Sequence, residues 1–246
     1  MKTFYLTDAG KIRTHNEDSV IILNNDNNEY IMAVADGMGG HKAGEVASSI
    51  ATEHIKKSFN KLKTIGSKED AIEWIRSIVT EINNKIFDYT NRHDESKGMG
   101  TTLVLAIKTN DYILFGNIGD SSGFVIKNDK MVKVTKDHTL VNLLVSTGEL
   151  TEEEAKYHPR KNVLMRALGA NNPIEVDIFD VDTSVKGIFL CSDGLTNMIT
   201  NEQIEKVLNS KLTIEEKVVR LIRKSNSRGG TDNISIAYMQ IESGDF

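Results

Sequence analysis

Cysteine and proline are both scarce in this chain of 246 residues, which contains one cysteine and two prolines. The lone Cys191 has no partner for an internal disulfide, and a chain of this length buries roughly 70–75% of its unfolded surface without such a cross-link. We therefore expect a reducing, cytoplasmic environment. No stretch rich in proline and serine marks a linker, so we expect a single domain over residues 1–246.

Long apolar runs and basic clusters are also missing. No apolar run approaches the ~20 residues that a membrane-spanning helix requires, and the N-terminus lacks the apolar segment of a signal peptide. The net charge is −5, and the absence of a basic cluster is a weak argument against nucleic acid as the main partner. The 39% hydrophobic and 26% charged residues are those of an ordinary globular protein.

The hydrophobic periodicity predicts strands and helices in a mixed order. Helices are expected at about 44–62, from Ser67 to a loop at 91–98, at 201–209 and at 213–226, with Ser67 and Asp70 as a pair resembling a capping box. The expected strands are 3–8, 19–23, 30–35, 101–108, 111–118, 122–127, 131–135, 174–181, 187–191 and 233–241. The four runs between 101 and 135 suggest an antiparallel meander. Residues 137–170 break the pattern and predict an insertion with short helices.

Four aspartates stand where apolar runs begin or end: Asp36, Asp120, Asp193 and Asp232. One Asp-Gly pair is usually only a turn, but four carboxylates at the rims of strands favour a shared site. Converging carboxylates repel each other unless a cation neutralises them. Oxygen ligands favour hard ions such as Mg²⁺ or Mn²⁺ over zinc. The pattern indicates a metal centre of the kind that commonly acts on phosphate esters.

A polar loop between two expected strands adds Arg13, Glu17 and Asp18. Arg13 has the geometry to bind phosphate oxygens bidentately, and the two acids are candidate ligands of a metal or of its waters. The alternative is a solvated loop with a surface ion pair. His41 follows a glycine-rich turn after Asp36, and on local evidence it is equally a proton donor or a structural group. Cys191 lies inside an apolar run, which predicts a buried thiol rather than a nucleophile.

Together these segments resemble the PPM family, the metal-dependent protein serine/threonine phosphatases of the type 2C class, and most of all its bacterial single-domain branch. The similar motifs run in order along nearly the whole chain: Thr7-Asp-Ala-Gly-Lys-Ile-Arg-Thr-His-Asn-Glu-Asp-Ser, Ala35-Asp-Gly-Met-Gly-Gly-His-Lys-Ala-Gly-Glu-Val-Ala-Ser, Gly98-Met-Gly-Thr-Thr, Asn117-Ile-Gly-Asp-Ser, Asp137-His-Thr-Leu-Val, His158-Pro-Arg-Lys-Asn-Val-Leu, Ser192-Asp-Gly-Leu-Thr and Gly230-Thr-Asp-Asn-Ile-Ser. The ordered set is far more specific than any one motif. One departure stands at Ser122, where the family usually has arginine.

The resemblance implies an α-β-β-α sandwich of two stacked antiparallel sheets flanked by helices. It also implies roles for individual residues. Two Mn²⁺ or Mg²⁺ ions and a third ion would be held by Asp36, the Gly37 carbonyl, Asp193, Asp232, Asp120 and, through water, Glu17 and Asp18. Arg13 would bind the substrate phosphate, and His41 would protonate the leaving alkoxide. Residues 137–170 would form a mobile flap near the substrate.

The resemblance further implies hydrolysis of phosphoserine and phosphothreonine in proteins by a hydroxide that bridges two ions, without a phosphoenzyme. The implied partners are phosphoproteins made by a cognate bacterial serine/threonine kinase, and we expect a monomer. Two alternatives stay open. One is a pseudophosphatase that binds partners without turnover, although every expected metal aspartate is present. The other is a phosphatase of a phosphorylated regulatory protein in a partner-switching cascade.

Overall fold

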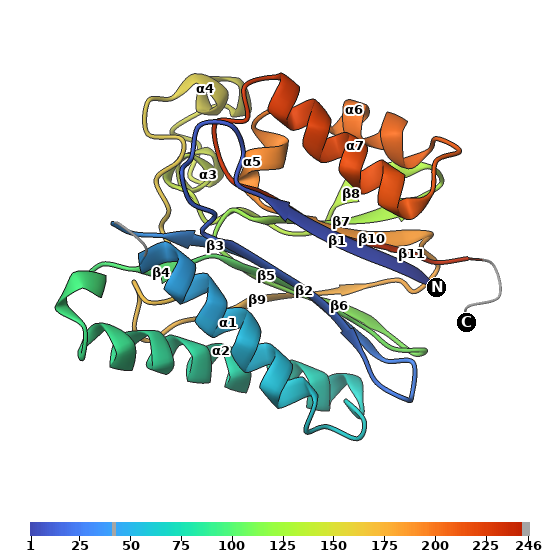
Figure 1. Cartoon of the computed structure of the whole chain (residues 1–246), viewed down its shortest axis with the longest axis horizontal. Coiled ribbons are helices and arrows are strands. Elements are labelled where there is room, and N and C mark those ends of the chain that lie inside the picture. Colours follow the sequence, from blue (N-terminus) through green and yellow to red (C-terminus); the bar gives the residue numbers. More distant parts are fainter. Residues whose placement is uncertain (41–42, 243–246) are drawn as a thin grey trace.

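Two antiparallel sheets are stacked face to face, and helices cover both outer faces (Figure 1). The computed structural model describes residues 1–40 and 43–242. This layering confirms the α-β-β-α sandwich implied by the resemblance. It places the helical segments where their apolar stripes are buried against a sheet, as amphipathic elements require.

The five-stranded sheet has the order β1 (Lys2–Asp8), β11 (Ile234–Gln240), β10 (Gly187–Cys191), β7 (Ser122–Lys127) and β8 (Lys130–Lys133). The six-stranded sheet has the order β2 (Asp18–Asn24), β3 (Tyr30–Met38), β5 (Leu103–Lys108), β6 (Ile113–Ile118) and β9 (Asp177–Val181), and the short β4 (Gly100–Thr101) pairs with β3. The first and last strands that the structure describes, β1 and β11, are direct neighbours, and β1 forms one edge of this sheet.

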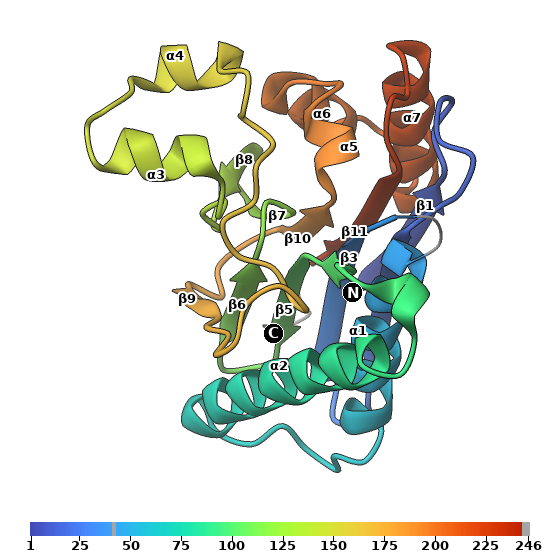
Figure 2. The ribbon, with the colours of Figure 1, turned by 90° about the vertical axis from the view of Figure 1, so that its left-hand side faces the viewer.

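The longest helices, α1 (Ala43–Phe59) and α2 (Lys68–Thr90), cover the six-stranded sheet, whereas α6 (Asn201–Leu208) and α7 (Ile214–Ser227) cover the other. The remaining helical turns are η1 (Asp94–Ser96), α3 (Leu140–Ser146), α4 (Glu152–Tyr157) and α5 (Asp193–Thr196). Figure 2 shows α3 and α4, which lie between β8 and β9 in the sequence, extending to one side of the sandwich.

The start of α2 follows directly from its sequence. Ser67 accepts a hydrogen bond from the Asp70 backbone N–H, and the Asp70 carboxylate accepts one from the Ser67 N–H, so the predicted capping box is confirmed. Both bonds satisfy N–H groups that a helix leaves without internal partners. The same reciprocal arrangement begins α7, between Thr213 and Glu216.

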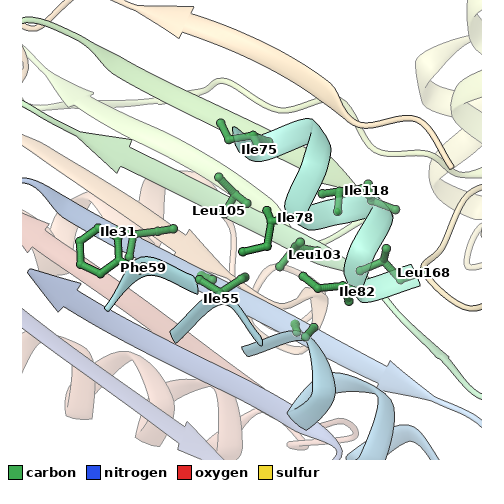
Figure 3. Close-up of a cluster of buried hydrophobic side chains, with 14 of the residues drawn as sticks. Ile31, Ile55, Phe59, Ile75, Ile78, Ile82, Leu103, Leu105, Ile118 and Leu168 are labelled. Carbon is green, nitrogen blue, oxygen red and sulfur yellow. The ribbon is translucent and has the colours of Figure 1, made fainter. Parts of the chain in front are cut away.

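Buried apolar side chains form three layers. One lies between the two sheets and includes Phe115 and Ile188. A second lies between the five-stranded sheet and α5–α7. The third joins α1 and α2 to the six-stranded sheet, and Figure 3 shows Ile78 and Ile82 of α2 pointing towards Leu103. Cys191 is free and fully buried in the second layer, and burial raises the pKa of its thiol, so the prediction of a core cysteine is confirmed.

The predicted meander between residues 101 and 135 is wrong. The runs β5 and β6 pair in the six-stranded sheet, but β7 and β8 pair in the other sheet. The chain changes sheets at Gly119, whose φ of +100° and close approach to Thr102 suit only glycine. Because all four runs are short and apolar, their sequence does not show which sheet each one joins.

Smaller differences concern the ends of elements. Helix α1 ends at Phe59 rather than near 62, β9 begins at Asp177 rather than 174, and η1 occupies part of the expected loop at 91–98. Within the described ranges, no helix combines the length and the apolar character needed to cross a bilayer.

We predict that Ile82→Ala lowers the free energy of unfolding by about 2–5 kcal/mol, because it leaves a cavity where a fully buried side chain packs between α2 and the sheet. Urea denaturation followed by circular dichroism measures this loss. The matched control is Asn84→Ala, an exposed position of the same helix, which should change stability by less than about 0.5 kcal/mol. Equal losses in both variants would contradict the packing role of Ile82.

Candidate active site

The strand register brings the acidic residues to one end of the sandwich. Asp18 begins β2 and lies opposite Asp36 of β3 in the antiparallel pair. Asp120 follows β6 by two residues and Asp193 follows β10 by two, whereas Asp232 precedes β11 by two. Since neighbouring strands run in opposite directions, strand ends and strand starts meet at the same edge. The acids therefore gather at one end of the sandwich, at the edge shared by the two stacked sheets.

A cavity of about 430 Å³ opens at this edge. Its lining contains most of the residues singled out in the sequence and several that were not: Arg13, Glu17, Asp36, Gly37, Met38, Gly39, Thr102, Asp120, Asn162, Leu164, Asp193, Asp232 and Asn233. Asp18 is not part of this lining, but it pairs with Asp36 across the strands and is 8% exposed. We call this cavity the carboxylate cleft. His41 lies outside the residues that the structure describes, so its predicted role stays a prediction from sequence.

Mutual repulsion and burial perturb these acids strongly. Burial raises the pKa of Asp36 well above its usual range, and the charges of Asp18, Asp193, Asp120 and Asp232 raise it further. The fact that all four neighbours act on Asp36 identifies it as the centre of the cluster. A buried group of this kind favours either protonation or a bound cation.

The other acids respond in the same direction. Burial, and then the charges of Asp193 and Asp137, raise the pKa of Asp120 to about 7. Burial raises the pKa of Asp18 to about 7 against the hydrogen bond from the Ser192 hydroxyl, which is 2.7 Å from Asp18 Oδ2. Burial also raises the pKa values of Asp193 and Glu17. Perturbation of several carboxylates in one cleft is typical of functional sites.

Three buried carboxylate oxygens have no hydrogen-bond partner within the described part of the chain: Glu17 Oε1, Asp18 Oδ1 and Asp193 Oδ1. Unsatisfied buried oxygens of charged groups are costly, and they are the donors that Mg²⁺ and Mn²⁺ prefer. In this respect the donor set fits the implied ions. However, no three His, Cys, Asp or Glu side chains among residues 1–40 and 43–242 are arranged to hold one ion as they stand.

Arg13 is the cation of the cleft. Its guanidinium Nη2 is 2.9 Å from Asp232 Oδ2. The charge of Asp232 raises the pKa of Arg13, and the charges of Glu17 and Asp36 raise it further. About half of the Arg13 side chain is exposed, so its remaining N–H groups are open to solvent at the mouth of the cleft. A guanidinium in this position is suited to an anionic group that enters the cleft.

Two threonines brace the backbone of Asp36. The Asp36 N–H donates to Thr102 Oγ1 at 3.0 Å, and the Asp36 carbonyl accepts from the Thr101 hydroxyl at 3.0 Å. The Thr102 hydroxyl is also 2.7 Å from the hydroxyl of Ser121, beside Asp120. Both threonines belong to the Gly-Met-Gly-Thr-Thr motif, but the sequence does not reveal their role, because a hydroxyl that braces a distant backbone leaves no local pattern.

Asn233 ties the Arg13–Asp18 loop to β11. Its Nδ2 donates to the carbonyls of Ala9 and His15, and its Oδ1 accepts from the Glu17 N–H. One amide therefore fixes both sides of a polar loop more than 200 residues away in sequence. The sequence does not reveal this role either, although Asn233 belongs to the Gly230-Thr-Asp-Asn-Ile-Ser motif.

Glycines allow the backbones around the cleft to approach closely. A Cβ on Gly37 would lie 2.1 Å from the Gly44 carbonyl oxygen, and one on Gly194 would lie 2.0 Å from the Asn233 carbonyl oxygen. Any larger residue would push apart the segments that carry Asp36, Asp193 and Asp232.

The insertion at 137–170 reaches the cleft, where Asn162 and Leu164 line its wall. Its base is held by an antiparallel bridge between Thr139 and Leu164. Ser122, the departure from the family pattern, is buried at the start of β7, and its hydroxyl lies 3.5 Å from the Asp120 carbonyl oxygen. This contact is at the limit of a hydrogen bond and holds the Asp120 loop only weakly.

Comparison with known proteins agrees with this geometry. The family described as protein phosphatase 2C matches residues 11–232. This chain belongs to that family. It is 42% identical over 241 residues to the serine/threonine phosphatase stp of Listeria monocytogenes, which covers 98% of this chain and 96% of the relative. It is 36% identical over 247 residues to the protein phosphatase PhpP of Streptococcus pneumoniae, covering 100% and 99% of the two chains.

Solved structures show the same fold. The serine/threonine phosphatase Stp1 of Staphylococcus aureus superposes with a TM-score of 0.92 at 34% identity, over 98% of this chain and 95% of that one. The serine/threonine phosphatase PstP/Ppp of Mycobacterium tuberculosis superposes with a TM-score of 0.83 at 30% identity, over 98% and 99%.

We predict that Thr102→Val lowers the free energy of unfolding by about 1–3 kcal/mol, because valine fills the same volume but leaves the Asp36 N–H without its acceptor. Chemical denaturation measures the change. Thr80→Val is the control, since the Thr80 hydroxyl donates to a helix carbonyl at an exposed position and its loss should be nearly neutral. A Thr102→Val variant as stable as Thr80→Val would show that the brace is unimportant.

Proposed function

We propose that the carboxylate cleft is the catalytic centre of a metal-dependent protein serine/threonine phosphatase. As a member of the protein phosphatase 2C family, the chain is a phosphoprotein phosphatase. The observation that carries the proposal is the group of buried carboxylate oxygens without partners, beside a half-exposed arginine in the same cleft. The carboxylates of such a cluster are suited to bind divalent cations, and its arginine is suited to bind a phosphate.

Asp36, with its backbone fixed by two threonines, is the residue we assign to both core ions. The Gly37 carbonyl would complete one ion, and Asp193 and Asp232 the other. Glu17 and Asp18 would orient bound water, and Asp120 together with Asp193 would hold a third ion. When bound, Mn²⁺ or Mg²⁺ supplies positive charge that polarises a phosphoryl oxygen and makes water a nucleophile near neutral pH.

The remaining steps belong to the side chains of this chain. Arg13 would bind two non-bridging oxygens of the substrate phosphate and hold phosphorus in line for attack. A seryl or threonyl alkoxide is a very basic leaving group, so it needs a proton as the bond to phosphorus breaks. We assign that proton to the imidazole of His41, on its position in the sequence after Asp36.

Substrate choice is assigned to residues 137–170, a flap within one catalytic domain. The support is that Asn162 and Leu164 of this segment line the cleft, yet belong to none of the acidic positions. The substrates would be phosphoproteins made by a serine/threonine kinase. A cytoplasmic location agrees with the single, buried, unpaired cysteine. We also expect a monomer.

A binding protein without turnover is disfavoured by the same cluster. A pseudophosphatase has no need to keep Asp36, Asp193 and Asp232 together at the cost of their mutual repulsion. Activity on a phosphorylated regulatory protein of a partner-switching cascade uses the same chemistry. It differs only in what the flap recognises.

We predict that phosphopeptide hydrolysis stops in EDTA and returns with Mn²⁺ or Mg²⁺, because the carboxylate oxygens require hard cations to act. Asp36→Asn should lower kcat by orders of magnitude and weaken Mn²⁺ binding measured by calorimetry, with an unchanged circular dichroism spectrum. The matched control is Asp26→Asn, an exposed carboxylate far from the cleft. Full turnover without metal, or Mn²⁺ binding unaffected by Asp36→Asn, would exclude the proposed centre.

We predict that Arg13→Ala lowers kcat/KM for a phosphopeptide by about 10–100-fold, because a charge-assisted hydrogen bond to phosphate is worth about 1.5–3 kcal/mol. Arg13→Lys should recover only part of this loss, since an ammonium does not bind bidentately. Lys11→Ala tests the same loop without touching the cleft and should be neutral. Mn²⁺ affinity measured on each variant separates phosphate binding from loss of the ions.

A further inference from the structure

A second cavity lies at the opposite end of the five-stranded sheet from the carboxylate cleft. It has a volume of about 470 Å³, and its lining combines polar and apolar side chains: Ile126, Asp129, Lys186, Leu208, Asn209, Ser210, Lys217, Tyr238, Gln240, Ile241 and Glu242. Gln240 ends β11, whereas Asp232 precedes the start of the same strand. The seven residues of β11 therefore separate the two cavities, and in Figure 1 this end of β11 lies on the side away from α5.

Lys217 is the unusual member of this lining. It belongs to the first turns of α7, its side chain is only 6% exposed, and it faces the cavity. No hydrogen bond or ion pair joins its ammonium to any residue in the described part of the chain. Burial lowers the pKa of Lys217, and the charge of Lys2 lowers it further. The side chain is largely covered while its ammonium has no counter-charge, an arrangement that an anion entering the cavity would stabilise.

The two acids of the cavity are already engaged. Asp129 forms an ion pair with Lys186 at 2.8 Å, and Glu242 forms one with Lys2. Neither acid appears among the charges that act on Lys217. The positive charge of Lys217 is therefore not balanced by the groups that share its cavity.

Tyr238 supplies a second donor. Its side chain is 3% exposed, and its ring is held against Phe189 with ring centroids 5.8 Å apart. Burial raises the pKa of Tyr238 to about 12, so its hydroxyl stays protonated. Within the described residues the hydroxyl forms no hydrogen bond, and buried tyrosines usually have one. Two largely buried side chains thus present donor atoms without protein partners to one cavity, whose apolar wall contains Ile126, Leu208 and Ile241.

We propose that this cavity binds a small organic oxyanion, with its negative group on the Lys217 ammonium and the Tyr238 hydroxyl and its apolar body against the isoleucine and leucine wall. The charge of Lys217 selects an anion, and the hydroxyl selects an acceptor oxygen. The cavity volume admits a molecule the size of a small metabolite. The site is independent of the proposed catalytic centre, since none of its lining residues belongs to the carboxylate cleft.

The experiment uses the 15N-labelled, Mg²⁺-loaded protein and benzoate as the probe. Benzoate should shift the backbone amide resonances of residues 217 and 238–241 in a saturable way, with a dissociation constant of about 1–10 mM. Benzamide, which has the same shape without the charge, should shift them at least about tenfold more weakly. Lys217→Gln should weaken benzoate binding by a similar factor, and Tyr238→Phe should weaken it less.

The matched control is Lys224→Gln, a lysine of the same helix that does not line the cavity, and it should bind benzoate like the unmodified protein. Lys217→Gln should also melt at a temperature no lower than the unmodified protein, because it removes a charge that no acid of the cavity balances. Lys217→Met serves in its place if glutamine disturbs packing. Equal binding of benzamide, shifts confined to residues 36–37 of the cleft, or binding unaffected by both Lys217 variants would overturn the proposal.

Discussion

The structure of the site depends on one constraint, which is that at least five carboxylates must be held together in a partly buried place where they repel each other. Burial raises the pKa of Asp36, and the charges of Asp18, Asp120, Asp193 and Asp232 raise it further. A chain free to relax would separate these groups. The neighbouring features all oppose that relaxation. Thr101 and Thr102 fix the backbone of β3, and Asn233 fixes the loop that carries Arg13 and Glu17. Gly37 and Gly194 permit backbone approaches that any side chain would prevent.

The same constraint explains what the sequence predicts well. A carboxylate that must reach the rim of a sheet follows or precedes an apolar strand, so Asp36, Asp120, Asp193 and Asp232 were visible one by one, and the strand register then brings them to one edge. Helix starts were equally visible, because the capping box of Ser67 and Asp70 is local in sequence. In both cases the signal and its cause lie within a few residues of each other.

What the sequence did not show is what depends on distant partners. The strand β7 carries no mark of its sheet, so the chain was expected to continue a meander where it changes layers at Gly119. Asn233 meets its partners Ala9 and His15 across more than 200 residues, and Ser192 meets Asp18 across 174. Lys217 reads as one more cation of an amphipathic helix. Only the packing of α7 on β1 and β11 leaves it nearly covered and without a counter-charge.

Strand β11 links the two ends of the sandwich. It pairs with β1 along its whole length and with β10 from Ile236 to Gln240, so it is an interior strand of its sheet, and the two cavities lie at its two ends. Asp232 and Asn233 precede it at the cleft, and Tyr238 and Gln240 lie at the other cavity. A strand hydrogen-bonded on both edges resists local displacement, because any shift would break ladder bonds to two neighbours. Because no residue lines both cavities, the strand relates them by position and not by a shared contact.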